Sequence, residues 1–130
     1  MFYRALNLSD TKVDIYALNG CNLDQAFSSC EILKTIRTLH VDEAVTFLNT
    51  FSTCRVLENV SFHGTIGNAL KLSDSPLLTH DSLMSVIDAL ADYSADTSGT
   101  VWTVTLGGVN MAKLSEEEIG IAVAKGWVLV

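Results

Sequence analysis

The apolar and polar positions of residues 27–36 recur in residues 51–60, so the two segments begin 24 positions apart. Both follow the pattern Phe-Ser-x-Cys-x-x-Leu-x-x-Ile/Val, in which the Phe, the first Ser, the Cys and the Leu are identical. A repeat of about 20–29 residues is typical of leucine-rich solenoids, whose coils bury their apolar positions by stacking on one another. The spacing therefore predicts stacked coils, with neighbouring strands near Ile36 and its counterpart Val60.

The segments on either side of the near-copies fit a leucine-rich template less closely. Residues 13–23 place apolar side chains in the slots of L-x-x-L-x-L-x-x-N/C-x-L, and residues 101–111 do so with Val109 in place of Asn or Cys. Short second strands are expected at residues 45–48 and 69–72, one for each near-copy.

Two helices are predicted in the second half of the chain. Thr79 is placed to cap the first, which carries an apolar stripe at helical spacing. Ser115 and Glu118 form the sequence signature of a capping box at the start of the second, and Gly126 is suited to end it. Strands are expected at residues 100–106 and 127–130. The apolar stripe of the first helix consists of Leu83, Val86, Ile87 and Leu90.

Charged residues at equivalent positions of the near-copies have opposite signs. Glu31 would face Arg55 on the next coil, and Lys34 would face Glu58. Such pairs across adjacent strands contribute at most about 1 kcal/mol at exposed sites. We expect them to help fix the register of the coils.

The pattern as a whole predicts an α/β fold, namely a short leucine-rich-repeat solenoid with a C-terminal helix–strand cap. A chain of 130 residues is expected to form one domain. Its parts would be repeat coils in residues 1–72, a helix-bearing coil in residues 73–111 and the cap in residues 112–130.

The near-copies resemble the BspA-type leucine-rich repeat, whose units carry Ala-Phe-x-x-Cys-x-x-Leu-x-x-Ile/Val. Ala26 completes the match before Phe27, whereas Thr50 replaces the Ala before Phe51. Residues 114–130 are similar to the C-terminal cap of leucine-rich proteins encoded by gut bacteria and their phages. The resemblance implies a non-enzymatic module for surface adhesion, host-protein binding or attachment in virions, without family-wide ligand residues to carry over.

The three cysteines leave two interpretations open. Cys30 and Cys54 occupy equivalent repeat positions and should lie on neighbouring coils. Free cysteines pack as small apolar side chains, which favours an interior ladder. Adjacent strands are also close enough for a disulfide. A zinc site is not expected, because the chain has no Cys-x-x-Cys pair or Cys/His spacing of that kind.

Composition excludes several classes of function. The net charge is −7, and the eight Lys and Arg residues do not cluster, so nucleic-acid binding is not expected. No apolar run approaches the ~18 residues that would span a bilayer, so membrane insertion is not expected either.

Enzymatic chemistry finds no support in the sequence. His40 and His63 lie nearly one repeat apart, but no carboxylate or thiol shares a metal-ligand spacing with them, so we interpret them as solvated side chains. No Gly-x-Ser-x-Gly motif accompanies a serine, histidine and aspartate. The chain is therefore expected to have no catalytic residues, metal or cofactor.

Polar residues on the predicted strands, beside the core positions, are the candidate contact residues. The set also includes Trp102, although strict alternation places Trp102 on the same face as the core position Val104, which favours a buried indole. The N-terminal end has no evident cap and would expose unpaired strand edge, so we expect it to dock on another chain or on a second copy. The strand candidates are Thr35, Arg37, Asn59, Ser61 and His63.

These patterns and the resemblance together predict a non-enzymatic protein-interaction or attachment module. We expect it in a phage virion, as a tail or structural component, or on a bacterial surface. Its partner would be a protein, a second copy or a host surface glycan. The alternative is a small phage-encoded inhibitor of a host enzyme or defence protein.

Overall fold

The computed structural model describes residues 10–130 and, for residues 11–13, the main chain alone. This part of the chain forms six strands and three helices. In chain order they are β1 (Asp10–Ala17), β2 (Thr35–Val41), β3 (Asn59–Gly64), β4 (Leu70–Lys71), α1 (His80–Ala89), β5 (Trp102–Thr105), α2 (Gly108–Met111), α3 (Glu116–Ala124) and β6 (Trp127–Leu129).

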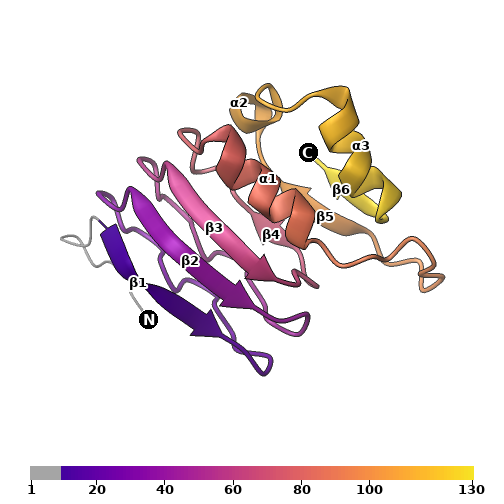
Figure 1. Cartoon of the computed structure of the whole chain (residues 1–130), viewed down its shortest axis with the longest axis horizontal. Coiled ribbons are helices and arrows are strands. Elements are labelled where there is room, and N and C mark those ends of the chain that lie inside the picture. Colours follow the sequence, from indigo (N-terminus) through magenta and orange to yellow (C-terminus); the bar gives the residue numbers. More distant parts are fainter. Residues whose placement is uncertain (1–9) are drawn as a thin grey trace.

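The strands form two parallel three-stranded sheets, with the orders β1-β2-β3 and β4-β5-β6. In Figure 1 the first sheet and α1 follow one another in one layer, and the second sheet lies behind them. One apolar core fills the space between the layers. It includes Ile36 and Val60 from the first sheet and Leu70 and Val104 from the second.

The two near-copies stack as their spacing predicts. Ile36 of β2 is paired with Val60 of β3. The rings of Phe27 and Phe51 stack in parallel, with centroids 5.8 Å apart. The interior ladder predicted for Cys30 and Cys54 is confirmed, because both side chains are fully buried and neither cysteine forms a disulfide.

The prediction of a short leucine-rich-repeat solenoid with a C-terminal helix–strand cap is wrong. The described chain forms two separate small sheets with three helices, and no repeating coil extends through it. Two near-copies determine how two neighbouring strands pair, but they do not determine the path of the chain beyond the second of these strands. After β3, α1 occupies the position at which a repeating coil would place its next strand (Figure 1).

Serine side chains of α1 replace the missing strand at the edge of β3. Val60 N donates to the hydroxyl of Ser82 at 3.0 Å, and Phe62 N donates to the hydroxyl of Ser85 at 3.2 Å. The Ser85 hydroxyl also lies 3.2 Å from the main-chain oxygen of Val60. Because buried main-chain groups need partners, these hydroxyls allow the sheet to end beneath a helix.

The predicted helix starts are confirmed. The Thr79 side chain accepts a hydrogen bond from Ser82 N, and Ser115 and Glu118 form the reciprocal capping box. Gly126 follows α3 with a φ of +87°, in the region that favours glycine. The local patterns that begin and end these helices therefore act as the sequence indicates.

Other local predictions are wrong. Residues 45–48 form no strand, and Thr46 makes only an isolated bridge to Asn22. Neither of the expected pairs Glu31–Arg55 and Lys34–Glu58 is an ion pair in the described part of the chain. The register is fixed instead by main-chain pairing and by the buried apolar ladder.

Candidate interaction surface

The outward side of β1–β3 presents a continuous set of polar and aromatic side chains, which we call the open face. Alternation along the strands buries one set of residues and exposes the other, except at an irregularity of β2 between Ile36 and Leu39 that leaves the adjacent Arg37 and Thr38 unburied. On β2 the buried set includes Ile36 and Leu39, and on β3 it includes Val60 and Phe62. The open face consists of Asp14, Tyr16, Thr35, Arg37, Thr38, His40, Asn59, Ser61 and His63.

A hollow of about 270 Å³ lies on the open face between β2, β3 and the start of α1. Four of the predicted contact residues line it, together with residues of α1 and its cap. The Thr79 hydroxyl approaches Asn59 Oδ1 at 3.4 Å across one side of the hollow. The predicted residues in this lining are Thr35, Arg37, Asn59 and Ser61.

Three rings form a column across the open face, one on each strand. Tyr16 stacks on His40 with centroids 4.1 Å apart and an interplanar angle of 1°. His40 meets His63 edge-on, with centroids 5.3 Å apart. The column follows from the register, which pairs Tyr16 with His40 and His40 with His63. Tyr16 remains 65% exposed and is available for contact.

An ion pair holds Arg37 beside this column. Arg37 Nε lies 2.9 Å from Asp14 Oδ1 on the neighbouring strand. The hydrogen bond from Arg37 holds the pKa of the Asp14 carboxyl below its usual range, and the same bond raises the pKa of Arg37. Asp14 Oδ2 also lies 3.9 Å from His40 Nε2. Asp14 therefore orients side chains of β2 on the open face.

His63 lies at a second, smaller hollow beside the end of α1. This hollow measures about 250 Å³, and Ser85 and Asp88 of α1 contribute to its lining.

Within residues 10–130, no group of three or more His, Cys, Asp or Glu side chains is arranged to hold a metal ion. None of the helices in this part of the chain is long and apolar enough to cross a membrane.

Trp102, the sixth predicted contact residue, lies on the other sheet. It is half-buried in β5, where its indole stacks on Tyr93 with centroids 4.4 Å apart. Its Nε1 donates to Asp96 Oδ2 at 2.9 Å. The structure therefore separates Trp102 from the five candidates of the open face.

Sequence reasoning missed Asp14, Tyr16, Thr38 and His40 as members of this surface. The repeat spacing contained the signal, because Tyr16 precedes His40 by 24 residues, the separation of the near-copies. Residues 13–23 resemble the near-copies too weakly for their outward side chains to be aligned with those of β2. The predicted docking of the N-terminal end concerns residues that precede the described ones.

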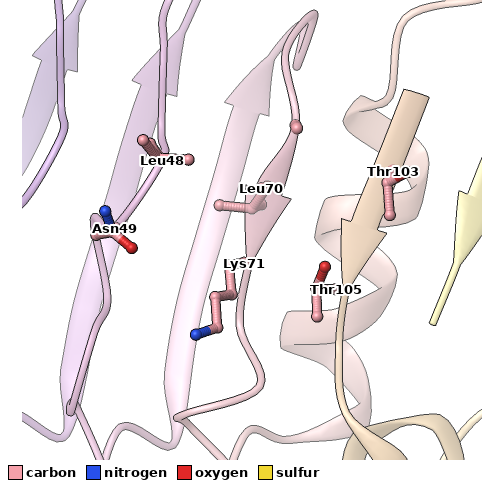
Figure 2. Close-up of a pocket in the computed structure, with 7 residues that line it drawn as sticks. Leu48, Asn49, Leu70, Lys71, Thr103 and Thr105 are labelled. Carbon is pink, nitrogen blue, oxygen red and sulfur yellow. The ribbon is translucent and has the colours of Figure 1, made fainter. Parts of the chain in front are cut away.

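A shallow apolar groove lies on the opposite side of the molecule (Figure 2). Its volume is about 170 Å³. Leu48 and Asn49 lie on one side of it, Leu70 and Lys71 come from β4, and two threonines come from β5. The molecule thus carries a polar open face on one layer and an apolar groove on the other.

Comparisons of the chain with protein-family models, with curated proteins and with solved structures found no match. The resemblance of residues 26–72 to BspA-type repeats stays a prediction.

Proposed function

We propose that this protein is a non-enzymatic interaction module that binds a partner protein through the open face. The observation that carries the proposal is the ordered set of Tyr, His, Arg and amide side chains on β1–β3. A surface formed by strands is more rigid than one formed by loops, and tyrosine and arginine are common at the energetic centres of protein interfaces.

Contacts within the open face favour binding because they reduce its entropic cost. Arg37 is held by Asp14, and Tyr16 is held against His40. Immobilising a free, rotamer-rich side chain on binding costs about 0.5–1.5 kcal/mol, and part of this cost is already met in the unbound protein. The hollow beside the column offers a recess for a side chain of the partner.

We place this activity in an attachment role, in a virion or on a bacterial surface. The support for this location is the resemblance of the near-copies to repeats of surface and phage proteins. Immunogold labelling of intact particles and cells of the source with an antibody against the chain tests it. Labelling confined to the cell interior would contradict the location and leave the open face as a binding surface.

A random peptide library displayed on phage and selected on the immobilised whole chain tests the binding surface. We expect enriched peptides to bind Arg37→Ala at least about tenfold more weakly than the unchanged protein, because such a loss corresponds to about 1.4 kcal/mol. Arg55→Ala is the matched control, because Arg55 is exposed at a different hollow.

Two results would refute the assignment of the open face. One is that no peptide is enriched. The other is that enriched peptides bind Arg37→Ala and Tyr16→Ala as tightly as the unchanged protein. Urea unfolding of each variant shows whether it is folded; neither side chain is buried.

A further inference from the structure

The side of the molecule opposite the open face carries exposed apolar side chains on the sheet β4-β5-β6 and on the turn beside it, a surface that we call the back face. Leu48 is 66% exposed there, and Val128 is 43% exposed. Val128 of β6 is paired with Thr103 of β5, and Lys71 of β4 is paired with Thr105. We define the back face as Leu48, Ala69, Lys71, Thr103, Thr105 and Val128.

The groove in the back face is of a size to accommodate a side chain of a partner. Its volume of about 170 Å³ is below the ~300 Å³ at which pockets for drug-sized ligands begin. Most of its lining is carbon, supplied by Leu48, Ala69 and the threonine methyl groups. Figure 2 shows Leu48 beside the groove, so a protruding leucine and an apolar recess lie next to each other.

We propose that a second copy of this chain docks on the back face, with Leu48 of each copy inserted into the groove of the other. A two-fold contact uses the same patch on both partners, so the patch must contain both the protrusion and the recess. The back face contains both.

The charges near the groove are compatible with self-association. Among the described residues that line the groove, Lys71 is the only charged one, although the chain carries a net charge of −7. Asp24 lies beside this segment, where its Oδ1 accepts a hydrogen bond from Asn49 N at 2.9 Å. Lys71 Nζ also lies 3.9 Å from Asp74 Oδ1 of its own copy. Both Lys71 and Asp24 lie at the contact, and a two-fold arrangement can place Lys71 of one copy opposite Asp24 of the other.

A back-to-back dimer leaves both open faces accessible, because they lie on the other layer of each copy (Figure 1). The dimer does not depend on the proposed function. Its consequence for that function is bivalency, since two linked sites can bind a multivalent partner more tightly than either alone.

Sedimentation velocity of the whole chain between about 5 and about 500 μM tests the proposal, because mass action shifts a reversible dimer across such a range. We expect the unchanged protein to pass from monomer to dimer. Leu48→Ser should weaken the dimer by about 100-fold, since the contact occurs twice and each loss is worth roughly tenfold. Leu77→Ser is the matched control, because Leu77 is 51% exposed and lies outside the back face.

Exchanging the charges of Lys71 and Asp24 distinguishes a specific contact from non-specific association. Lys71→Glu should weaken the dimer, and combining it with Asp24→Lys should restore part of the affinity. The proposal is overturned if the unchanged protein stays monomeric throughout, if Leu77→Ser weakens the dimer as much as Leu48→Ser, or if the exchange restores nothing. A dimer that survives Leu48→Ser but is lost in Tyr16→Ala would place the contact at the edge strand β1 and also overturn the proposal.

Discussion

Replacement of Asn110 by alanine should destabilise the protein more than any change at its exposed amides. Asn110 lies in α2, and its side chain is 1% exposed. Its Nδ2 donates to the main-chain oxygens of Leu72 at 3.3 Å, Ser75 at 3.1 Å and Leu106 at 3.0 Å. Its Oδ1 accepts from Lys113 Nζ at 3.1 Å. One amide thus joins the end of β4, the turn after it and the end of β5.

The size of the effect follows from the number of donors. An amide nitrogen carries two hydrogens, so the three carbonyl contacts amount to two full hydrogen bonds. Each contributes about 0.5–1.5 kcal/mol net, and the loss of packed atoms adds to this. Leu72 and Ser75 each keep a main-chain donor to the same oxygen, which limits the cost. We therefore expect Asn110→Ala to lower the free energy of unfolding by about 2–3 kcal/mol.

Urea unfolding followed by circular dichroism measures this change. With a slope near 2 kcal/mol per molar, within the usual range of about 1–3, the midpoint should fall by about 1–1.5 M while the slope stays constant. Asn68→Ala is the matched control. Asn68 Nδ2 donates to the oxygens of Val45 at 2.9 Å and Glu43 at 3.2 Å, but its side chain is only half-buried, so water can replace it.

Asn68→Ala should therefore lower the free energy of unfolding by about 1 kcal/mol or less. The prediction is refuted if the free energy of unfolding of Asn110→Ala lies within about 0.5 kcal/mol of that of the unchanged protein, because surface substitutions usually change it by no more than this. It also fails if the two alanine variants are equally destabilised.

Three further predictions concern other parts of the fold. Gly64→Ala should lower the free energy of unfolding, measured in urea, by at least about 2 kcal/mol, because the φ of Gly64 is +100° and a Cβ there would collide with a main-chain oxygen of β2. In contrast, Gly120→Ala should raise the free energy of unfolding by about 0.5–1 kcal/mol, because Gly120 lies in a helix with open space around it. A thiol reagent near pH 8 should modify the partly exposed Cys21 in the folded protein but reach Cys54 only on unfolding, because burial raises the pKa of Cys54 to about 12. Rapid modification of all three cysteines in the folded protein would contradict this. The hydrogen bond from Ser115 N, and to a lesser extent that from His80, holds the pKa of the Glu118 carboxyl below its ordinary 4.5. The contribution of the Glu118 carboxylate to stability is therefore full above pH 4.5 and is lost as the pH falls through the lowered pKa. Melting temperatures of Glu118→Gln should accordingly depend less on pH in that acidic range, and parallel curves would refute the linkage.

Features set by neighbours in the sequence could be predicted. The capping box of Ser115 and Glu118 spans one helical turn, so its signal lies within a few residues. The pairing of Ile36 with Val60 followed from a near-copy, because equal spacing places equivalent residues on adjacent strands. Five of the six predicted contact residues lie on one sheet for the same reason.

Features set by distant partners could not be predicted. Nothing near Ser82 and Ser85 shows that their hydroxyls occupy the edge of β3 in place of another strand. Asn110 resembles an ordinary turn residue, and only the convergence of β4 and β5 buries it. Nothing in the sequence around Trp102 shows that its indole stacks on Tyr93.

The sequence by itself determined the strand spacing, the buried ladder of Phe27, Cys30, Phe51 and Cys54, and the helix starts, because these depend on periodicity and local hydrogen bonds. The tertiary structure alone decided where the repeating pattern ends, and which side chains meet on the open face and the back face. Those outcomes depend on which residues, far apart in the chain, satisfy one another's main-chain groups and fill the shared core.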